Sequence, residues 1–233
     1  MFIVIKKKHI ALVSLLIVAI ILSGVIFSAV SRTEYVYTIP GSQYTVVIDA
    51  GHGGIDGGCV GDRTGVYESE LNLTYAKTLA GTLNRMGISV VMTRVNSDGL
   101  YDSSASNLKR SEMLYRKKII EESNADMVLS IHMNSFPIKS PRGAQVFYKK
   151  DSVIGENLAS SLQTILHKDI PYAKRTAKVG DYYVLNCTDT PSALVECGFL
   201  SNPEEESLLQ DKAYMEKFCY TLCCGIVDYL NSK

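Results

Sequence analysis

Two kinds of hydrophobic pattern alternate along most of this chain. Short apolar runs bounded by glycine or polar residues predict buried strands. These runs fall at residues 44–49, 88–93, 127–131, 144–148, 182–185 and 192–196. Apolar residues that recur every three or four positions predict amphipathic helices, at residues 68–87, 106–123, 153–166 and 214–230. Strands alternating with helices in this way predict an α/β fold, a single domain with a mostly parallel twisted sheet flanked by helices.

The N-terminal region departs from this pattern. Three lysines, Lys6–Lys8, precede an uncharged apolar stretch at residues 10–30, which is about long enough to span a bilayer. Because positive charge before a span stays in the cytoplasm, we predict a cytoplasmic basic segment (1–8), a transmembrane helix or signal sequence (9–30) and an exported remainder. The apolar stretch exceeds that of a typical signal peptide, which favours a retained membrane anchor over cleavage near Ser31.

Residues 31–43 are polar and are interrupted by Pro40-Gly41, which predicts a linker between membrane and domain. The domain itself is then expected at residues 44–233, a usual size for one α/β domain.

Composition narrows the classes of partner and site. The formal net charge is zero with mixed signs, so no nucleic-acid partner is expected. The six cysteines contain no CxxC pair, and three of them lie in one helical pattern. We therefore interpret them mostly as free thiols and expect no zinc ribbon.

Chemically active side chains follow or end several of the predicted strands. His52 follows the first strand in a glycine-rich loop, His132 follows strand 127–131, and Glu196 ends strand 192–196. Glu68 stands at the start of the first helix, directly after the same glycine-rich loop. Because the carboxyl ends of parallel strands share one edge of a sheet, we expect all four residues to converge there.

Two histidines and one carboxylate are the ligand set of a catalytic zinc ion that keeps one position open. Such an ion lowers the pKa of bound water and polarises a carbonyl oxygen, but a further carboxylate must carry the proton. Glu196 lies in the apolar segment ALVECGF, where burial would raise its pKa towards neutrality. The sequence therefore suggests metal-assisted hydrolysis of an amide.

Each of these residues also has a structural interpretation. His52 could cap a turn, His132 could be a hydrogen-bonded histidine at a strand end, and Glu68 is favoured by the helix dipole. Glu196 is the strongest candidate alone, because a buried carboxylate is costly unless it is paired or used. Rival sites find no support, since the chain lacks GxGxxG, GxxxxGK[ST], GxSxG and HExxH motifs.

Six motifs in order give the chain a family resemblance. They are VVIDAGHGGIDGG, ESELNL, VVMTR, ADMVLSIHMNS, RGAQVFY and ALVECGFLSNPEE. Over residues 44–230 the chain resembles the zinc-dependent N-acetylmuramoyl-L-alanine amidases. Within that family, RGAQVFY and the tail ALVECGFLSNPEEESLL are most similar to the spore-cortex members.

The resemblance implies a Zn²⁺ site on His52, Glu68 and His132, with Glu196 as the catalytic carboxylate. It also implies hydrolysis of the amide between the lactyl group of N-acetylmuramic acid and L-alanine in peptidoglycan. In spore-cortex members this step precedes formation of muramic-δ-lactam. Division-type relatives carry an inserted helix that blocks the zinc site, but the segment at residues 134–142 is too short for one.

Two alternatives remain open from sequence. The chain could be a non-catalytic peptidoglycan-binding or scaffold protein on an amidase fold, or a zinc peptidase that cuts the peptide itself. The sequence also leaves open whether an accessory protein is needed for zinc binding or activity. No substrate-binding residues are predicted.

Overall fold

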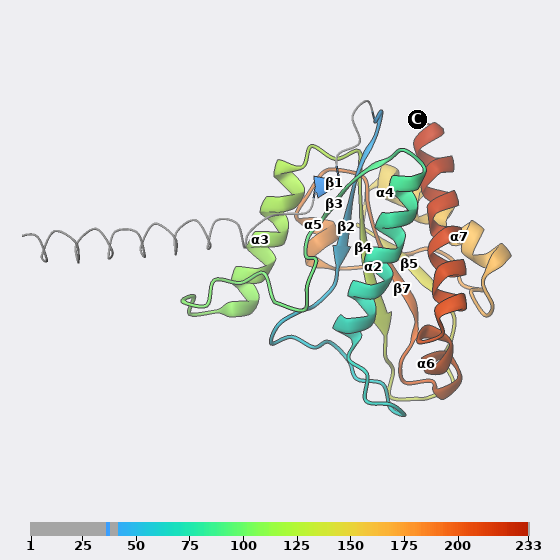
Figure 1. Cartoon of the computed structure of the whole chain (residues 1–233). Coiled ribbons are helices and arrows are strands. Elements are labelled where there is room, and N and C mark those ends of the chain that lie inside the picture. Colours follow the sequence, from blue (N-terminus) through green and yellow to red (C-terminus); the bar gives the residue numbers. More distant parts are fainter. Residues whose placement is uncertain (1–35, 38–41, 233) are drawn as a thin grey trace, which may run out of the picture. The chain divides into compact units, whose positions relative to one another are not determined.

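The computed structural model describes residues 36–37 and 42–232, which form one sheet with helices on both faces (Figure 1). The strands are β1 (Val36–Tyr37), β2 (Thr45–Ala50), β3 (Ser89–Met92), β4 (Met127–Asn134), β5 (Gln145–Tyr148), β6 (Lys178–Val179) and β7 (Ser192–Phe199). The helices described are α2 (Glu68–Arg85), α3 (Leu108–Glu122), α4 (Val153–Asp169), α5 (Tyr183–Asn186), α6 (Pro203–Leu209) and α7 (Lys212–Asn231).

The sheet has seven strands in the order β1-β3-β2-β4-β7-β5-β6. Its four central strands, β3, β2, β4 and β7, run parallel, while β1 and β5 each pair antiparallel with a neighbour. The predicted α/β class and the mostly parallel sheet are therefore confirmed. This order matters for the site, because it places β2, β4 and β7 side by side.

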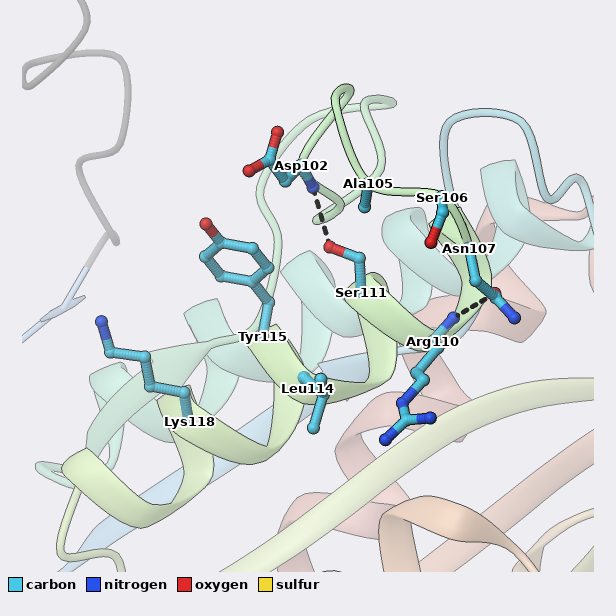
Figure 2. A pocket seen from close by; sticks show the side chains of 9 residues that line it. All are labelled: Asp102, Ala105, Ser106, Asn107, Arg110, Ser111, Leu114, Tyr115 and Lys118. Carbon is cyan, nitrogen blue, oxygen red and sulfur yellow. Dashed lines mark hydrogen bonds between the residues drawn. The ribbon is translucent and has the colours of Figure 1, made fainter.

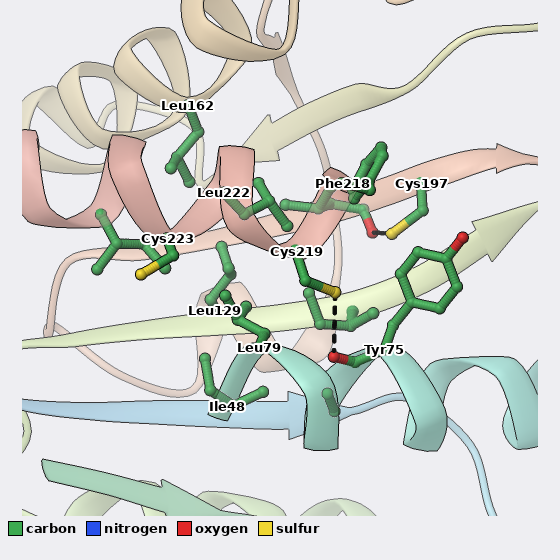
Figure 3. Close-up of a cluster of buried hydrophobic side chains, with 14 of the residues drawn as sticks. Ile48, Tyr75, Leu79, Leu129, Leu162, Cys197, Phe218, Cys219, Leu222 and Cys223 are labelled. Carbon is green, nitrogen blue, oxygen red and sulfur yellow. Dashed lines mark hydrogen bonds between the residues drawn. The ribbon is translucent and has the colours of Figure 1, made fainter. Parts of the chain in front are cut away.

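Alternate residues of the central strands enter two different cores. Val46 and Ile48 face the larger core, which is covered by α2, α4 and α7 and shown in part in Figure 3. Val47 faces a smaller core on the other side of the sheet, where α3 and α5 pack. Burial on both faces explains why these strands are continuously apolar in sequence.

The cysteines add small buried side chains rather than crosslinks. All six are free, and Cys197, Cys219 and Cys223 are buried. The Cys219 thiol donates a hydrogen bond to the Tyr75 carbonyl at 3.5 Å within the larger core (Figure 3). The prediction of free thiols is confirmed.

The predicted strand at residues 182–185 is wrong. Tyr183–Asn186 forms the one-turn helix α5, in which the Leu185 and Asn186 amides both donate to the Tyr182 carbonyl at 3.1 Å. This turn buries Val184 and Leu185 in the smaller core. A four-residue apolar run satisfies either geometry, so its pattern could not separate the two.

The two shortest strands, β1 and β6, were not predicted. Val36–Tyr37 lies inside the predicted linker at 31–43 and pairs antiparallel with β3 at the edge of the sheet. The segment between β4 and β5 contains no helix, as its length predicts.

The predictions for residues 1–30 lie outside the described residues. Within 36–37 and 42–232, no helix combines the length and apolar character needed to cross a membrane.

Candidate metal centre

Three of the four central parallel strands, β2, β4 and β7, bring three of the predicted residues to one edge of the sheet. His132 lies in β4 and is paired directly with Glu196 of the neighbouring β7. His52 follows the end of β2, which pairs with β4 on the other side. Glu68 is the first residue of α2. The predicted convergence is confirmed.

His52, Glu68 and His132 each offer a ligand atom, and these atoms lie within 4.8 Å of one another. The Glu68 Oε1 atom is 3.1 Å from His52 Nε2 and 2.9 Å from His132 Nδ1. The carboxylate is buried, whereas both imidazoles reach solvent in part. Two imidazole nitrogens and one carboxylate oxygen, open on one side, form a donor set that fits a catalytic transition-metal ion.

The loop that carries His52 is shaped around this centre. A Cβ atom at Gly51 would lie 2.3 Å from the His132 ring, and one at Gly58 would lie 2.5 Å from Glu68 Oε2. His52 itself has a φ of 60°. For a residue other than glycine this conformation costs about 1–3 kcal/mol and is kept only where the surroundings impose it. If His52 only capped a turn, as its structural interpretation has it, neither the close approach of the glycines nor the strained φ would be needed.

Backbone and amide donors fix the Glu68 carboxylate. Its Oε2 accepts from the Cys59 amide at 2.9 Å, and its Oε1 accepts from the Met133 amide and the Asn72 side chain, both at 3.2 Å. Burial alone would raise the pKa of Glu68, but the neighbouring His132 and His52 hold it well below its usual range. Glu68 is therefore a carboxylate at any working pH, as a metal ligand must be.

The second nitrogen of His52 has its own partner. His52 Nδ1 is 3.0 Å from Asp56 Oδ2, the arrangement in which a carboxylate orients a metal-binding histidine. Burial lowers the pKa of His52, but Glu68 and Asp56 raise it on balance to about 9. Asp56 was not predicted as a site residue; its position four residues after His52 in the glycine-rich loop is the signal that could have indicated it.

Glu196 is buried beside the three candidate ligands but is not bonded to them. Its Oε2 atom has no hydrogen-bond partner among the described residues, although its side chain is in the sheet interior. Burial raises the pKa of Glu196 to about 7, with Glu68 adding to the rise and the histidines opposing it. The predicted elevation is confirmed, so this carboxyl group can accept or release a proton near neutral pH.

Two buried arginines, Arg94 and Arg116, lie behind the loop and were not predicted as site residues. Arg94 donates to the Gly51 carbonyl, next to His52, and Arg116 donates to the carbonyl of His52 itself. The sequence marks both as arginines at positions where an apolar residue is expected. Arg94 comes directly after a buried strand, and Arg116 lies on the core face of a helix.

A separate groove of about 450 Å³ lies along α3 and the loop before it (Figure 2). Arg110 and Leu114 are among its lining residues, and it shares no residue with the metal centre. The candidate chemistry is therefore not located in this groove.

Comparison with known proteins agrees with this geometry. Residues 46–228 match the family model Amidase_3, described as N-acetylmuramoyl-L-alanine amidase. The germination-specific N-acetylmuramoyl-L-alanine amidase of Bacillus subtilis is 33% identical over 201 residues, which cover 84% of each chain.

Two solved structures from the same comparison resemble the fold closely. The CwlD amidase of Clostridioides difficile, in complex with the GerS lipoprotein, has a TM-score of 0.79 and 35% identity and covers 82% of this chain and 100% of its own. An N-acetylmuramoyl-L-alanine amidase from Clostridium difficile 630 has a TM-score of 0.75 and 30% identity, with 83% of this chain and 100% of its own covered. Because the family model covers residues 46–228, which include all four candidate site residues, this chain belongs to the Amidase_3 family of N-acetylmuramoyl-L-alanine amidases, enzymes that act on peptidoglycan.

Proposed function

We propose that this chain is a zinc-dependent amidase in which His52, Glu68 and His132 hold the ion and Glu196 is the catalytic carboxylate. The amide cleaved is the one between the lactyl group of N-acetylmuramic acid and L-alanine. One observation carries the proposal. The cluster of three donors lies beside the buried carboxyl group of Glu196, which comes from the strand next to that of His132 and has an oxygen without a hydrogen-bond partner among the described residues. Zinc at such a site supplies Lewis-acid polarisation of the carbonyl and an acidified water.

The side chains of the site have separate roles in metal binding and in proton transfer. Glu68 stays ionised and the two histidines face it, so the donors are pre-oriented before substrate arrives. Glu196, with a pKa raised to about 7, takes a proton from the attacking water and returns it to the leaving nitrogen of L-alanine. The free Oε2 of Glu196 leaves an acceptor available for that transfer.

The substrate is proposed to be spore-cortex peptidoglycan, with cleavage ahead of muramic-δ-lactam formation. Support comes from the similarity to the germination-specific amidase of Bacillus subtilis and to the CwlD amidase. The experiment is digestion of purified peptidoglycan by the full-length protein in detergent with zinc present, followed by mass spectrometry of the soluble products. Free stem peptides that begin with L-alanine are expected. Peptides cut internally would instead indicate a zinc peptidase.

A variant separates catalysis from binding alone. Glu196→Gln is expected to sediment with peptidoglycan as the unmodified protein does, yet to release stem peptides about 10²–10⁴-fold more slowly. If the unmodified protein binds peptidoglycan but releases none, with zinc and any partner supplied, the chain is a non-catalytic binding protein and the proposal fails.

We also propose an accessory protein and a membrane location. The CwlD amidase was solved with a lipoprotein, which supports a partner that aids zinc binding or activity here. The lysine-flanked apolar stretch at residues 10–30 supports a membrane anchor with the catalytic domain outside the cytoplasm, or secretion after cleavage near Ser31. Metal content of the isolated chain tests the partner, and the N-terminal sequence of the membrane-bound protein tests the anchor.

A further inference from the structure

We infer that Arg116, together with Arg94, is a positioning residue of the metal centre. The two guanidinium groups hold three successive backbone carbonyls, those of Ala50, Gly51 and His52, and thereby keep His52 facing Glu68. This inference rests on the proposed function, because it concerns the site at which zinc would bind.

Arg116 reaches the loop from α3. One of its terminal nitrogens donates to the Ala50 carbonyl at 2.8 Å and also contacts the Asp49 carboxylate. The other donates to the His52 carbonyl and to Glu112 Oε1, both at 2.6 Å. Its side chain is 3% exposed, and the two carboxylates compensate its charge, so this is a paired buried cation.

Arg94 approaches the same loop from the end of β3. Its Nε donates to the Ala50 carbonyl at 3.0 Å, and one terminal nitrogen donates to the Gly51 carbonyl at 2.8 Å and to the Ser69 carbonyl at 2.7 Å. The loop is therefore tied to β3, to α3 and to the first turn of α2, the helix that begins with Glu68.

These contacts explain how a strained residue is kept in place. His52 has a φ of 60°, a region that side chains with a Cβ avoid unless their surroundings impose it. A return to the extended or helical region would turn the His52 carbonyl away from Arg116 and leave a buried donor unpaired. The same rotation would move the His52 ring away from Glu68.

The contacts also explain the residue type. The planar guanidinium presents its donors as a fork, which lets Arg116 bond two carbonyls and two carboxylates at once. Lysine carries the same charge but presents its donors from one point. Arg116→Lys therefore keeps the charge balance with Asp49 and Glu112 while losing part of the clamp on the loop.

The test compares zinc affinity among full-length proteins in detergent, measured by competition with a chromophoric chelator. Arg116→Lys and Arg94→Lys are expected to weaken zinc binding by about 10–100-fold, the usual effect of losing a group that orients a ligand. Two controls should leave the affinity unchanged: Lys118→Gln on the exposed side of α3, and Leu162→Ala, which destabilises the larger core away from the site. Unchanged affinity in Arg116→Lys, or an equal loss in Leu162→Ala, would overturn the inference.

A second measurement needs no metal. The amides of Gly53 and Gly54 donate to the Asp56 and Ser97 carbonyls, both at 2.8 Å, so their hydrogen exchange reports order in the loop. Arg116→Lys should accelerate exchange at these two amides and leave the amides of β4 unchanged; no acceleration would refute the clamp. If the unmodified protein binds no zinc even when the proposed accessory protein is supplied, the proposed function fails, whereas the exchange result still decides the clamp.

Discussion

Glu196 lies directly opposite His132 where the parallel strands β7 and β4 pair. The carboxyl group that we propose moves the proton is thus one strand away from a proposed zinc ligand, and both are fixed by the same ladder of backbone hydrogen bonds. Neither side chain depends on a loop for its position. This leaves the glycine-rich loop with His52 as the part of the centre that needs separate support.

One part of the centre is therefore held by the sheet and the other by the loop and the start of α2. His132 and Glu196 come from sheet positions, while His52 and Glu68 are joined by the loop between β2 and α2. If zinc binds as proposed, disturbing the loop alone should weaken zinc binding without loss of the fold.

The proposed role of Glu196 predicts a specific loss of activity. Replacing it with glutamine keeps the shape but removes the group that accepts and returns the proton. We expect the rate of stem-peptide release to fall by about 10²–10⁴-fold. Zinc content, measured by atomic emission, should stay at the level of the unmodified protein. Loss of zinc in Glu196→Gln would show that the residue is instead needed to form the metal centre.

The raised pKa of Glu196 predicts a pH-dependent cost to folding in the metal-free protein. Because its pKa rises from 4.5 to about 7 on folding, its effect on stability is absent below pH 4.5, grows unfavourable between pH 4.5 and about 7, and is constant above that range. At pH 8 the penalty is of the order of 3 kcal/mol. Glu196→Gln should therefore unfold at higher urea concentration than the unmodified protein at pH 8, and at a similar one at pH 4.5. Equal midpoints at both pH values would contradict burial of an ionisable Glu196.

The raised pKa of His52 predicts how zinc binding depends on pH. With its pKa at about 9 in the metal-free site, His52 carries a proton at pH 7 that zinc must displace. Apparent affinity should therefore rise with pH by about tenfold per unit between pH 7 and 9 and level off above that range. Chelator competition across this range measures the slope. Asp56→Asn, which removes one of the groups that raise the pKa, should shift the levelling to lower pH.

The placement of the candidate site residues was largely predictable, because these residues follow strong local patterns. His52, His132 and Glu196 each stand at or near the end of an apolar run, and a parallel sheet brings such ends to one edge. Their identity as potential donors follows from side-chain chemistry. The apolar runs do not predict distances between side chains. Only the structure shows that the three donor atoms lie within 4.8 Å of one another and that one Glu196 oxygen has no hydrogen-bond partner among the described residues.

The supporting residues were harder to predict for a physical reason. Arg116 occupies a core-facing position of α3, where a periodicity argument expects an apolar side chain. Its role depends on Asp49, 67 residues earlier in the chain, and no local pattern reports such a pair. The helix α5 was missed for a related reason, since packing rather than periodicity decides the form of a four-residue apolar segment.

Two glycine substitutions distinguish effects on zinc binding from effects on the stability of the fold. Gly51→Ala places a methyl group 2.3 Å from the His132 ring and should abolish zinc binding and stem-peptide release. Gly81→Ala, in the middle of α2, meets only Arg85 Nη1 at 3.7 Å and should raise the free energy of unfolding by about 0.5–1 kcal/mol. Zinc affinity and urea midpoints of both variants check the pair. Normal zinc affinity in Gly51→Ala would show that His132 can move aside without consequence.

The buried ion pair of Asp49 and Arg116 predicts how the stability of the fold depends on pH. Burial raises the pKa of Asp49, but Arg116 and the Ser130 and Thr93 hydroxyls lower it on balance to about 2. Because the pKa of Asp49 is lower in the folded state, its carboxylate stabilises the fold fully above pH 3.8, its ordinary pKa. This stabilisation is lost as pH falls towards 2. Removing one partner of a buried pair costs about 3–5 kcal/mol, so Asp49→Asn should lower the free energy of unfolding by that amount at pH 7.

Urea unfolding of Asp49→Asn at pH 7 and at successively lower pH measures the effect. The difference from the unmodified protein should shrink between pH 4 and 2, because over this range Asp49 takes up a proton in the unfolded state before it does so in the folded state, which favours unfolding of the unmodified protein. Glu122→Gln on the same helix is the control, since its carboxylate pairs with Lys118 at an exposed surface, 3.8 Å away, and should change little at any pH. A difference that stays constant down to pH 2 would mean that the Asp49 charge is not what stabilises the fold. Zinc affinity of Asp49→Asn should fall together with stability, because Arg116 then loses the carboxylate that orients it towards the His52 carbonyl.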